Sequence, residues 1–331
     1  MQNVQKTLAM APQNPRRISV IIPTYNRKSL IVDTIESFLG QDYQNFEVIV
    51  CNNNSTDNTQ EVLEAYLGNS KVSLLFEERA GVHFARNTAA KCASGDILYF
   101  TDDDMIATPN LLSEIVKIFD LDESIASATG RVLPKWEIEP PKWVEKLLFN
   151  ARLSLNNPTE ELIISSDDFG VYSCHQAILR EAFFKAGGFN PDYVAGILIG
   201  DGETGLNLKI KELGYKFGYI GSSIIYHRIP PAKMTQKYLN SRLENEGYCH
   251  AYTNIRLCNG VIDLPKEIRR ELGLFWYKFK LNLKNSKSDI NYLRFVQGDL
   301  KYMFAKLSYY RKAKGDSEFM EMILRQNWLE E

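Results

Sequence analysis

Three consecutive aspartates, Asp102, Asp103 and Asp104, follow the apolar segment at residues 97–100 after a single threonine. Adjacent carboxylates repel one another and destabilise a fold unless a cation lies among them. At the carboxyl end of a buried parallel strand, a divalent metal with a phosphorylated ligand supplies that cation, and oxygen ligands favour Mg²⁺ or Mn²⁺. A solvated acidic turn or a helix N-cap explains the same residues equally well, so the surrounding elements must decide.

The first hundred residues alternate between strand and helix patterns. The expected strands are residues 18–22, 46–51, 72–76 and 96–100, and the expected helices between them are residues 29–39, 59–67 and 81–93. Such alternation with short polar loops predicts an α/β fold with a doubly wound, mostly parallel sheet. Ligands bind at the carboxyl ends of strands in such sheets, where the segments 23–27, 52–57 and 102–104 are expected to meet.

The pattern is less regular from residue 111 onward. We expect helices at 111–119, 180–186 and 204–213, strands at 174–179, 216–220 and 223–226, and a loop over a pocket at 134–143. Helical spacing continues from residue 230 to the end, which predicts a helical C-terminal extension.

Composition and charge narrow the classes of protein further. Five cysteines without a CxxC pair argue against a disulfide framework or a zinc site and favour a reduced, cytoplasmic setting. No apolar run reaches the ~18 residues of a membrane span. The first 17 residues are polar and contain Pro12 and Pro15, which predicts a loose arm and not a signal peptide.

The C-terminal hundred residues are basic, although the net charge of the chain is −2. Residues 264–314 hold 13 Lys and Arg against four Asp and Glu, and residues 274–280 mix aromatic side chains with lysine, as interfacial helices do. This predicts contact with an anionic membrane surface, peripheral on the inner face of the cell membrane. An ordinary helical subdomain with a solvated basic face is the alternative. No nucleic-acid-binding module is recognisable, so we expect no nucleic-acid partner.

Several short motifs resemble the family 2 glycosyltransferases in their order and spacing. They are residues 19–27, 47–50, 54–57, 81–87, 101–104, 186–189, 200–203, 214–215 and 226–227. The resemblance covers residues 18–230. It implies a GT-A fold, a nucleotide-sugar donor, a divalent metal (Mn²⁺ or Mg²⁺) and an inverting transfer.

The resemblance also implies roles on the metal side of the site. Asp102 would hold the ribose or base of the donor, and Asp104 would ligate a metal that bridges the diphosphate. Asp103 would be a further ligand or a group behind the ligands. His227 would complete the metal shell through a ring nitrogen, although a lone histidine is more often a packed or surface residue.

The first loop would meet the nucleobase and ribose through Pro23, Thr24, Tyr25, Asn26 and Arg27. Tyr25 offers a face for stacking, or it serves packing alone. Three residues elsewhere are expected beside the donor as well, and two of them, Glu47 and Arg86, have a structural alternative.

Glu47 lies near the nucleotide in relatives, but a solvated carboxylate at a strand end explains it as well. Asn53 stands where many relatives carry an aspartate that accepts from uracil N3–H. An amide both accepts and donates, so uracil is favoured but another base stays open. Arg86 would reach base or phosphate through its rigid fork, or it forms a surface salt bridge.

On the acceptor side, Glu203 aligns with the general base of relatives, and Asp201 is its rival. Relatives often carry a further acid where this chain has Gly205, and both acids could instead serve the N-terminus of the following helix. His175 would line the acceptor or donor-sugar pocket. Trp136 would stack on a sugar ring, and packing is the alternative for both.

These observations predict a transferase that moves a sugar from a nucleotide-diphosphate sugar, UDP favoured, to a hydroxyl of a glycan or lipid-linked saccharide in surface polysaccharide synthesis. The expected parts are a flexible arm (1–17), a nucleotide-sugar-binding half (18–130), an acceptor-binding half (131–230) and a basic helical region (231–331). The alternatives are a non-catalytic nucleotide-sugar-binding or assembly protein with the same fold, and a nucleotidyltransferase, whose phosphate loop residues 23–28 match poorly.

Overall fold

The computed structural model describes residues 15–148, 151–191 and 200–330, so most of the expected N-terminal arm lies outside the described residues. Within them, a single sheet of nine strands runs in the order β3-β2-β1-β4-β8-β6-β9-β5, and β7 pairs with β9. The strands are β1 (Ile18–Thr24), β2 (Phe46–Asn52), β3 (Val72–Phe76), β4 (Ile97–Thr101), β5 (Met105–Ala107), β6 (Ile125–Trp136), β7 (Leu162–Ser165), β8 (His175–Leu179) and β9 (Lys216–Ile229).

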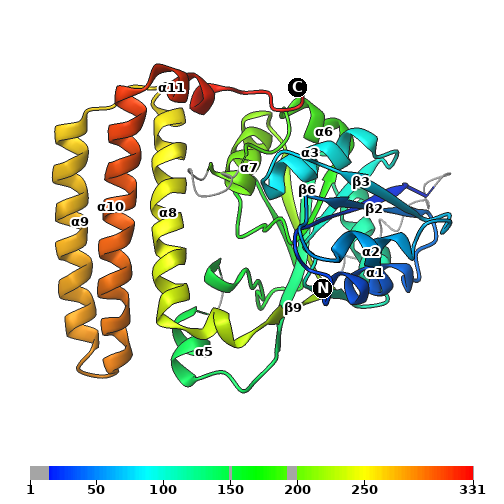
Figure 1. Ribbon diagram of the computed structural model, residues 1–331, viewed down its shortest axis with the longest axis horizontal. Helices are drawn as coiled ribbons and strands as arrows, with labels where there is room; N and C mark the ends of the chain where they lie inside the picture. Colours follow the sequence, from blue (N-terminus) through cyan, green and yellow to red (C-terminus); the bar gives the residue numbers. More distant parts are fainter. Residues whose placement is uncertain (1–14, 149–150, 192–199, 331) are drawn as a thin grey trace, which may run out of the picture.

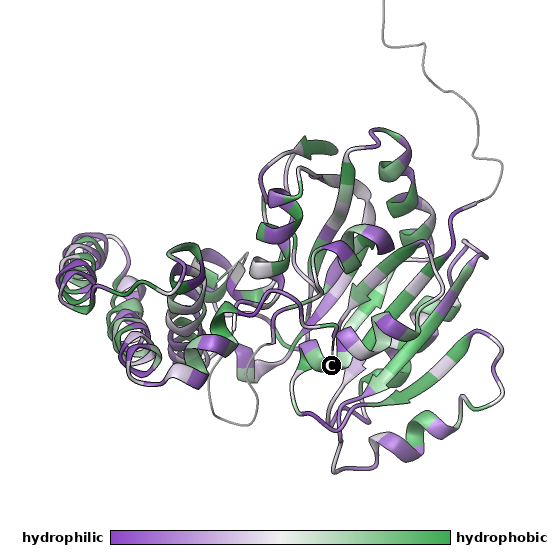
Figure 2. Cartoon of the chain, turned by 90° about the horizontal axis from the view of Figure 1, so that it is seen from above, coloured by the Kyte–Doolittle hydropathy of each residue, from purple (hydrophilic) through white to green (hydrophobic). Residues whose placement is uncertain are grey.

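The first four strands are parallel and form the expected doubly wound half. The helices that connect them are α1 (Ile31–Leu39), α2 (Thr59–Glu64) and α3 (Val82–Cys92). β1 and β4 are fully buried, because apolar side chains on both faces pack under helices (Figure 1). The interior strands are correspondingly apolar in Figure 2. The strand and helix boundaries agree with the sequence prediction to within a few residues.

The middle of the chain differs from the prediction. β8 is inserted antiparallel between β4 and β6, and β6 pairs parallel with β9. β6 runs for 12 residues, through the expected domain boundary at 130/131 and into the expected loop at 134–143. β9 is one strand of 14 residues where two short strands were expected. One sheet therefore continues through both predicted halves.

Shorter helices surround this part of the sheet. They are α4 (Leu111–Lys117), α5 (Lys142–Leu148), α6 (Arg180–Lys185) and α7 (Gly202–Glu212), with single 3₁₀ turns at Ile118–Asp120, Ala151–Leu153, Pro231–Met234 and Ile290–Leu293.

The C-terminal region is helical, as expected. It consists of α8 (Gln236–Leu257), α9 (Leu264–Asn285), α10 (Arg294–Gly315) and α11 (Ser317–Leu324). Figure 1 shows α8 beside the sheet domain, α10 against α8, and α9 at the outside. Across residues 15–148, 151–191 and 200–330, none of the helices has the length and apolar character that crossing a bilayer would require.

Candidate active site

A cavity of about 630 Å³ opens at the carboxyl ends of β1, β2 and β4. Segments between residues 23 and 242 line it, including the N-terminus of α3, the residues before β8, the first turn of α7, and α8. The lining residues are Pro23, Thr24, Tyr25, Arg27, Asn53, Ala80, Gly81, Val82, His83, Arg86, Asp102, Asp103, Asp104, Ser154, Tyr172, Ser173, Cys174, Glu203, Lys233 and Arg242.

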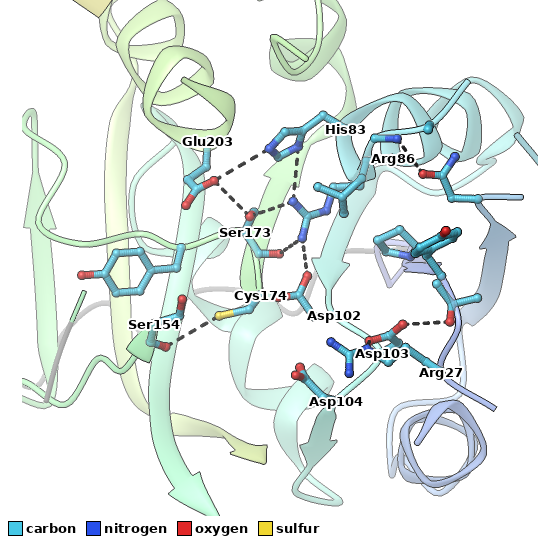
Figure 3. A pocket seen from close by; sticks show the side chains of 18 of the residues that line it. Arg27, His83, Arg86, Asp102, Asp103, Asp104, Ser154, Ser173, Cys174 and Glu203 are labelled. Carbon is cyan, nitrogen blue, oxygen red and sulfur yellow. Dashed lines mark hydrogen bonds and ion pairs between the residues drawn. The ribbon is translucent and has the colours of Figure 1, made fainter. Parts of the chain in front are cut away.

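The three aspartates lie together on one wall, directly after β4 (Figure 3). The buried Asp103 accepts a hydrogen bond from Thr24 Oγ1 at 2.8 Å and lies 3.7 Å from Arg27 Nε. Burial, and then the neighbouring charge of Asp104, raises the pKa of Asp103 to about 7. The carboxylates therefore crowd one another, as adjacent like charges at a strand end are expected to do.

Asp104 lies beside two basic side chains, His227 near the end of β9 and Lys233 in the turn that follows it. The antiparallel pairing of Met105 with His227 brings the imidazole beside the aspartate, with Nε2 3.5 Å from Oδ2. Lys233, in the following 3₁₀ turn, lies 3.2 Å from Asp104 Oδ2 and 2.8 Å from His227 Nε2. Burial opposes ionisation of Asp104, but hydrogen bonding and charge from His227 and Lys233 outweigh it and lower the pKa of this carboxyl.

These groups also fit a divalent metal. His227 Nδ1 lies 2.9 Å from the carbonyl oxygen of Leu153, to which it donates, so when the ring is neutral its free lone pair is on Nε2, the nitrogen nearest Asp104. The carboxylate of Asp104 and the imidazole of His227 lie side by side and are ligand types that suit Mn²⁺. The ammonium of Lys233 contacts both groups. Among the described residues, no three His, Cys, Asp or Glu side chains form a complete metal site.

Arg86 connects the aspartates to the opposite side of the cavity. Because β8 runs antiparallel to β4, the residues before β8 lie beside those after β4. The buried guanidinium donates to Asp102 Oδ1 at 2.5 Å and to Ser173 Oγ at 2.8 Å. Arg86 therefore fixes Asp102 and Ser173 and is not the surface salt bridge considered above.

Glu203 faces the cavity from the first turn of α7, on the other side from Asp103 and Asp104 (Figure 3). Its Oε2 lies 3.4 Å from Ser173 Oγ, which donates to it, and 3.9 Å from His83 Nε2. Arg86 approaches Nδ1 of His83 at 3.3 Å, so Nδ1 accepts and the proton of the neutral ring is on Nε2, toward Glu203. Burial, and then the charge of Arg86, lowers the pKa of His83 and keeps the ring neutral.

Gly202 allows this close approach of α7 to α3. It has φ of +46°, and a Cβ atom there would lie 2.4 Å from His83 Nε2. Any side chain at this position would both strain the backbone and displace the histidine.

Asp201 does not reach the cavity, although it is only two residues from Glu203. Its buried carboxylate accepts from Asn190 Nδ2 at 2.6 Å and from Thr253 Oγ1 at 3.1 Å, which ties α7 to α8. A Cβ atom at residue 205 would lie 2.1 Å from Asp201 Oδ1, so Gly205 provides the space that this carboxylate fills. Burial raises the pKa of Asp201, and its hydrogen bonds oppose that shift.

Asn53 lines the cavity and also holds the loop before α3. Its amide nitrogen donates to the carbonyl oxygens of Glu77 at 3.0 Å and Arg79 at 2.7 Å, and its Oδ1 accepts from Gly81 N at 2.8 Å. An aspartate has no N–H group to donate these two bonds, so the loop structure itself explains why residue 53 is an asparagine. Only the remaining lone pair of Oδ1 is left for a base.

The other members of the predicted donor loop divide into two groups. Pro23, Thr24, Tyr25 and Arg27 line the cavity, and Tyr25 is 53% exposed, as a stacking face requires. Asn26 is outside the cavity lining: it has φ of +54°, and its Oδ1 accepts from the backbone N–H of residues 56 and 57.

Three further predicted residues lie away from the cavity. Glu47 is at the amino end of β2, where Oε1 accepts from Ser19 Oγ at 2.6 Å, because the loop edge of the sheet is at the opposite end of the strand. His175 is fully buried against Tyr99, whose hydroxyl lies 2.6 Å from Nδ1. Trp136 packs on the apolar core at the end of β6. For His175 and Trp136, the packing alternative describes the observed position, whereas Glu47 is a largely buried carboxylate held by Ser19 and Ser94 and not the solvated one considered above.

The sequence analysis missed several residues of the cavity, notably His83, Ser173 and Lys233. His83 could have been found, because it precedes Arg86 by three residues and so shares one face of α3. The others come from segments that carry no local signal and approach the site only in the folded chain.

Comparison with known proteins agrees with this geometry. The fold and site define a glycosyltransferase of the GT-A type. Residues 19–187, just over half of the chain, match the model of glycosyl transferase family 2, and the chain belongs to that family.

The chain is similar to several curated members. It is 44% identical over 97 residues to the UDP-Glc:alpha-D-GlcNAc-diphosphoundecaprenol beta-1,3-glucosyltransferase WfgD of Escherichia coli, which covers 29% of this chain and 38% of that protein. It is 35% identical over 103 residues to the validoxylamine A glucosyltransferase of Streptomyces hygroscopicus subsp. jinggangensis (strain 5008), covering 30% and 24%. The matches to curated relatives described here thus span well under half of each relative.

A solved structure shows the same fold over most of the chain. The mannosyltransferase PcManGT from Pyrobaculum calidifontis, in complex with GDP-Man and Mn²⁺, superposes with a TM-score of 0.59 at 19% identity. The match covers 92% of this chain and 90% of that one. It therefore extends through the C-terminal helices, beyond the part that the family model matches.

Proposed function

We propose that this glycosyltransferase moves a sugar from a nucleotide-diphosphate sugar, UDP favoured, to a hydroxyl of a glycan or lipid-linked saccharide, with inversion at the anomeric carbon. One observation carries the proposal: the cavity has crowded acids and cations on one side and a separate carboxylate, Glu203, on the other. Sugar transfer needs both, because the leaving diphosphate must be neutralised while the acceptor hydroxyl loses its proton. Surface polysaccharide synthesis is the setting that a lipid-linked acceptor suggests.

The donor would lie along the first loop and the aspartates. Tyr25 offers an exposed ring for the base, and one lone pair of Asn53 Oδ1 is left to accept from a uracil N3–H. Asp102, held by Arg86, would accept from the ribose hydroxyls. Arg27 and Lys233 bring positive charge toward the diphosphate and would stabilise it as it leaves.

A divalent metal, Mn²⁺ or Mg²⁺, would be held by Asp104 and His227, and the substrate would have to supply further ligands. When bound, it would act as a Lewis acid on the diphosphate oxygens. Lys233 would leave these two ligands and turn to the phosphates, since its side chain is on the cavity wall. Asp103 would support Asp104 from behind through Thr24.

Glu203 would act as the general base for the acceptor hydroxyl. Ser173 and the neutral His83 both face its Oε2, so they would hold the carboxylate in a fixed orientation. Asp201 is the weaker candidate, because its two oxygens are engaged by Asn190 and Thr253 outside the cavity.

Nucleotide binding and turnover, measured on the same protein, test the proposal. We expect a nucleoside diphosphate with Mn²⁺ to raise the melting temperature, because a ligand at 100 times its Kd stabilises by about 2.7 kcal/mol. We expect UDP to raise the melting temperature more than GDP, ADP or CDP does. Asp104→Asn should remove the metal-dependent part of the shift, while Asp33→Asn, an exposed aspartate on α1, should keep it.

Turnover is then followed as nucleoside diphosphate released from a panel of donor sugars with saccharide acceptors. Binding without release from any donor would favour the non-catalytic alternative. Failure to bind any nucleoside diphosphate, with or without metal, would contradict the proposed donor class altogether.

A further inference from the structure

The outermost helix, α9, has an unusual distribution of side chains. The only residues of α9 that are buried are polar, Glu271 and Asn282. Its exposed residues include Leu272, Leu274, Trp276, Tyr277, Leu281 and Leu283. A helix normally turns its apolar side toward the protein, whereas α9 buries two polar side chains and leaves several large apolar ones exposed.

The contacts between α9 and α10 explain why the polar residues are inside. Glu271 pairs with Lys306 of α10 at 3.0 Å. Asp299 of α10 accepts from Asn282 at 3.0 Å and pairs with Lys278 at 3.3 Å. These polar bonds join the two helices, and the exposed apolar side chains of α9 lie outside this interface.

The exposed apolar residues form stripes along the helices, together with the half-buried Phe279 and Leu307. Leu272, Trp276, Phe279 and Leu283 follow the i, i+4, i+7, i+11 spacing of one helix face, and the rings of Trp276 and Phe279 are in contact. On α10, Leu300, Phe304 and Leu307 repeat this spacing, and Phe304 is 59% exposed. Among the residues that the structure describes, ten of the 21 exposed large apolar side chains fall within residues 264–314.

Basic side chains border the stripe on α9. At 100° per residue, Arg269, Lys280 and Lys284 lie next to Trp276 around the helix, and all three are exposed. The four acids of residues 264–314 do not neutralise them. Glu267, Glu271, Asp289 and Asp299 each pair with another cation, namely Arg270, Lys306, Lys146 and Lys278.

We propose that the α9–α10 hairpin is a membrane-docking surface that lies on an anionic lipid bilayer, with its apolar stripes at the acyl boundary and its lysines among the headgroups. An apolar stripe with flanking Lys, Arg and Trp is what an interfacial helix presents. Charge complementarity selects this occupant: a second copy of the chain would bring two strongly basic hairpins together, whereas an anionic leaflet attracts each lysine. Figure 2 shows the hairpin at one end of the molecule, away from the sheet and with mixed polar and apolar colours.

Vesicle flotation tests this surface on the full chain. We expect the protein to float with phosphatidylglycerol–phosphatidylcholine (1:1) vesicles, to stay behind with pure phosphatidylcholine, and to detach as salt rises. Lys280→Gln with Lys284→Gln should lower the partition coefficient about thirty-fold, since each lysine near an anionic leaflet raises it about five-fold. Lys135→Gln with Lys142→Gln, an exposed pair on the sheet domain, should leave it unchanged.

The apolar stripe is tested in the same way. Trp276→Ser with Phe304→Ser should abolish flotation, and Leu67→Ser with Leu121→Ser, exposed residues elsewhere, should not. Absence of flotation with anionic vesicles, or equal losses in the control pairs, would overturn the proposal. The proposal would also be overturned if the wild type sediments as a dimer, and if the double variant Trp276→Ser with Phe304→Ser sediments as a monomer but still floats with vesicles. Flotation needs no nucleotide, so its outcome is independent of the proposed reaction.

Discussion

The cavity and the α9–α10 interface both contain buried charged side chains, but they distribute them differently. In the cavity, three carboxylates share one opening, and burial together with Asp104 raises the pKa of Asp103 to about 7. Between the helices, Glu271 and Asp299 each face a lysine of the other helix. Crowded like charges cost stability until a ligand arrives, whereas paired charges fix how two helices meet. The same residue types therefore fix how two helices meet in one region, and in the other we propose that they bind a ligand.

The largest effect should come from the cavity. Glu203→Gln removes the proposed general base and should lower turnover about 1000-fold, because such a group contributes about 10²–10⁴. Nucleotide affinity and thermal stability should be unchanged, because Glu203 lies across the cavity from Asp103 and Asp104. The readout is the initial rate of nucleoside diphosphate release.

Asp201→Asn is the matched control for that variant. It should keep its turnover per folded molecule and lose stability, because its carboxylate joins α7 to α8 through Asn190 and Thr253. If Asp201→Asn is inactive while Glu203→Gln is fully active, the roles of the two acids are reversed.

The second effect concerns the helical interface. Glu271→Ala should cost about 3–5 kcal/mol of unfolding free energy, since it leaves the buried Lys306 without its carboxylate partner. Urea denaturation followed by circular dichroism measures it. The double change Glu271→Leu with Lys306→Met should recover most of the loss, and turnover of the folded fraction should stay normal. A comparable loss in the double variant would mean that the pair is not the cause.

The third effect depends on pH and concerns the sheet core. Burial lowers the pKa of His175 to about 4, from an ordinary value of 6.5. In the unfolded chain His175 therefore binds a proton below pH 6.5, whereas in the folded protein it does not bind one until about pH 4. The free energy of unfolding should fall by about 3 kcal/mol from this group as pH decreases across that window.

His175→Asn checks this assignment by denaturant unfolding at pH 7, 6, 5 and 4. The variant should be less stable than the wild type at pH 7, and the difference should shrink toward pH 4. Parallel pH curves for the two proteins would show that His175 does not stay neutral in the fold.

The smallest effect is expected at the loop before α3. Asn53→Asp replaces two donated hydrogen bonds with a carboxylate facing the carbonyl oxygens of Glu77 and Arg79. We expect a loss of about 2 kcal/mol in stability, measured by thermal or urea unfolding. Asn53→Ser is the control, because it removes the bonds without adding a charge. Equal stability of Asn53→Asp and wild type would show that the loop rearranges freely.

The parallel half of the fold could be predicted because its strands are buried on both faces and read as continuous apolar runs. The aspartates, the first loop, Asn53 and Arg86 follow from it, since all lie at the carboxyl ends of strands or the start of α3. The same rule would have excluded Glu47, which stands second in its strand. Family resemblance alone kept it in the prediction.

The rest of the sheet could not be read from local pattern. β6 contains Gly130 and Pro134, and β9 contains Gly218, Gly221 and two serines, which are typical of turns. Pairing with long neighbouring strands overrides these preferences. Lys233 was missed for a related reason, because its partner Asp104 comes from a distant segment.

Helix α8 stands between the two regions compared above. Its Arg242 lines the cavity, and other residues of α8, such as His250, contact α10 through Tyr302. Packed helices move as stiff bodies because their interiors have little free space. A tilt of the α9–α10 hairpin would therefore move α8 and with it one wall of the cavity, so that a displacement at the outer edge of the molecule would change the shape of the proposed site.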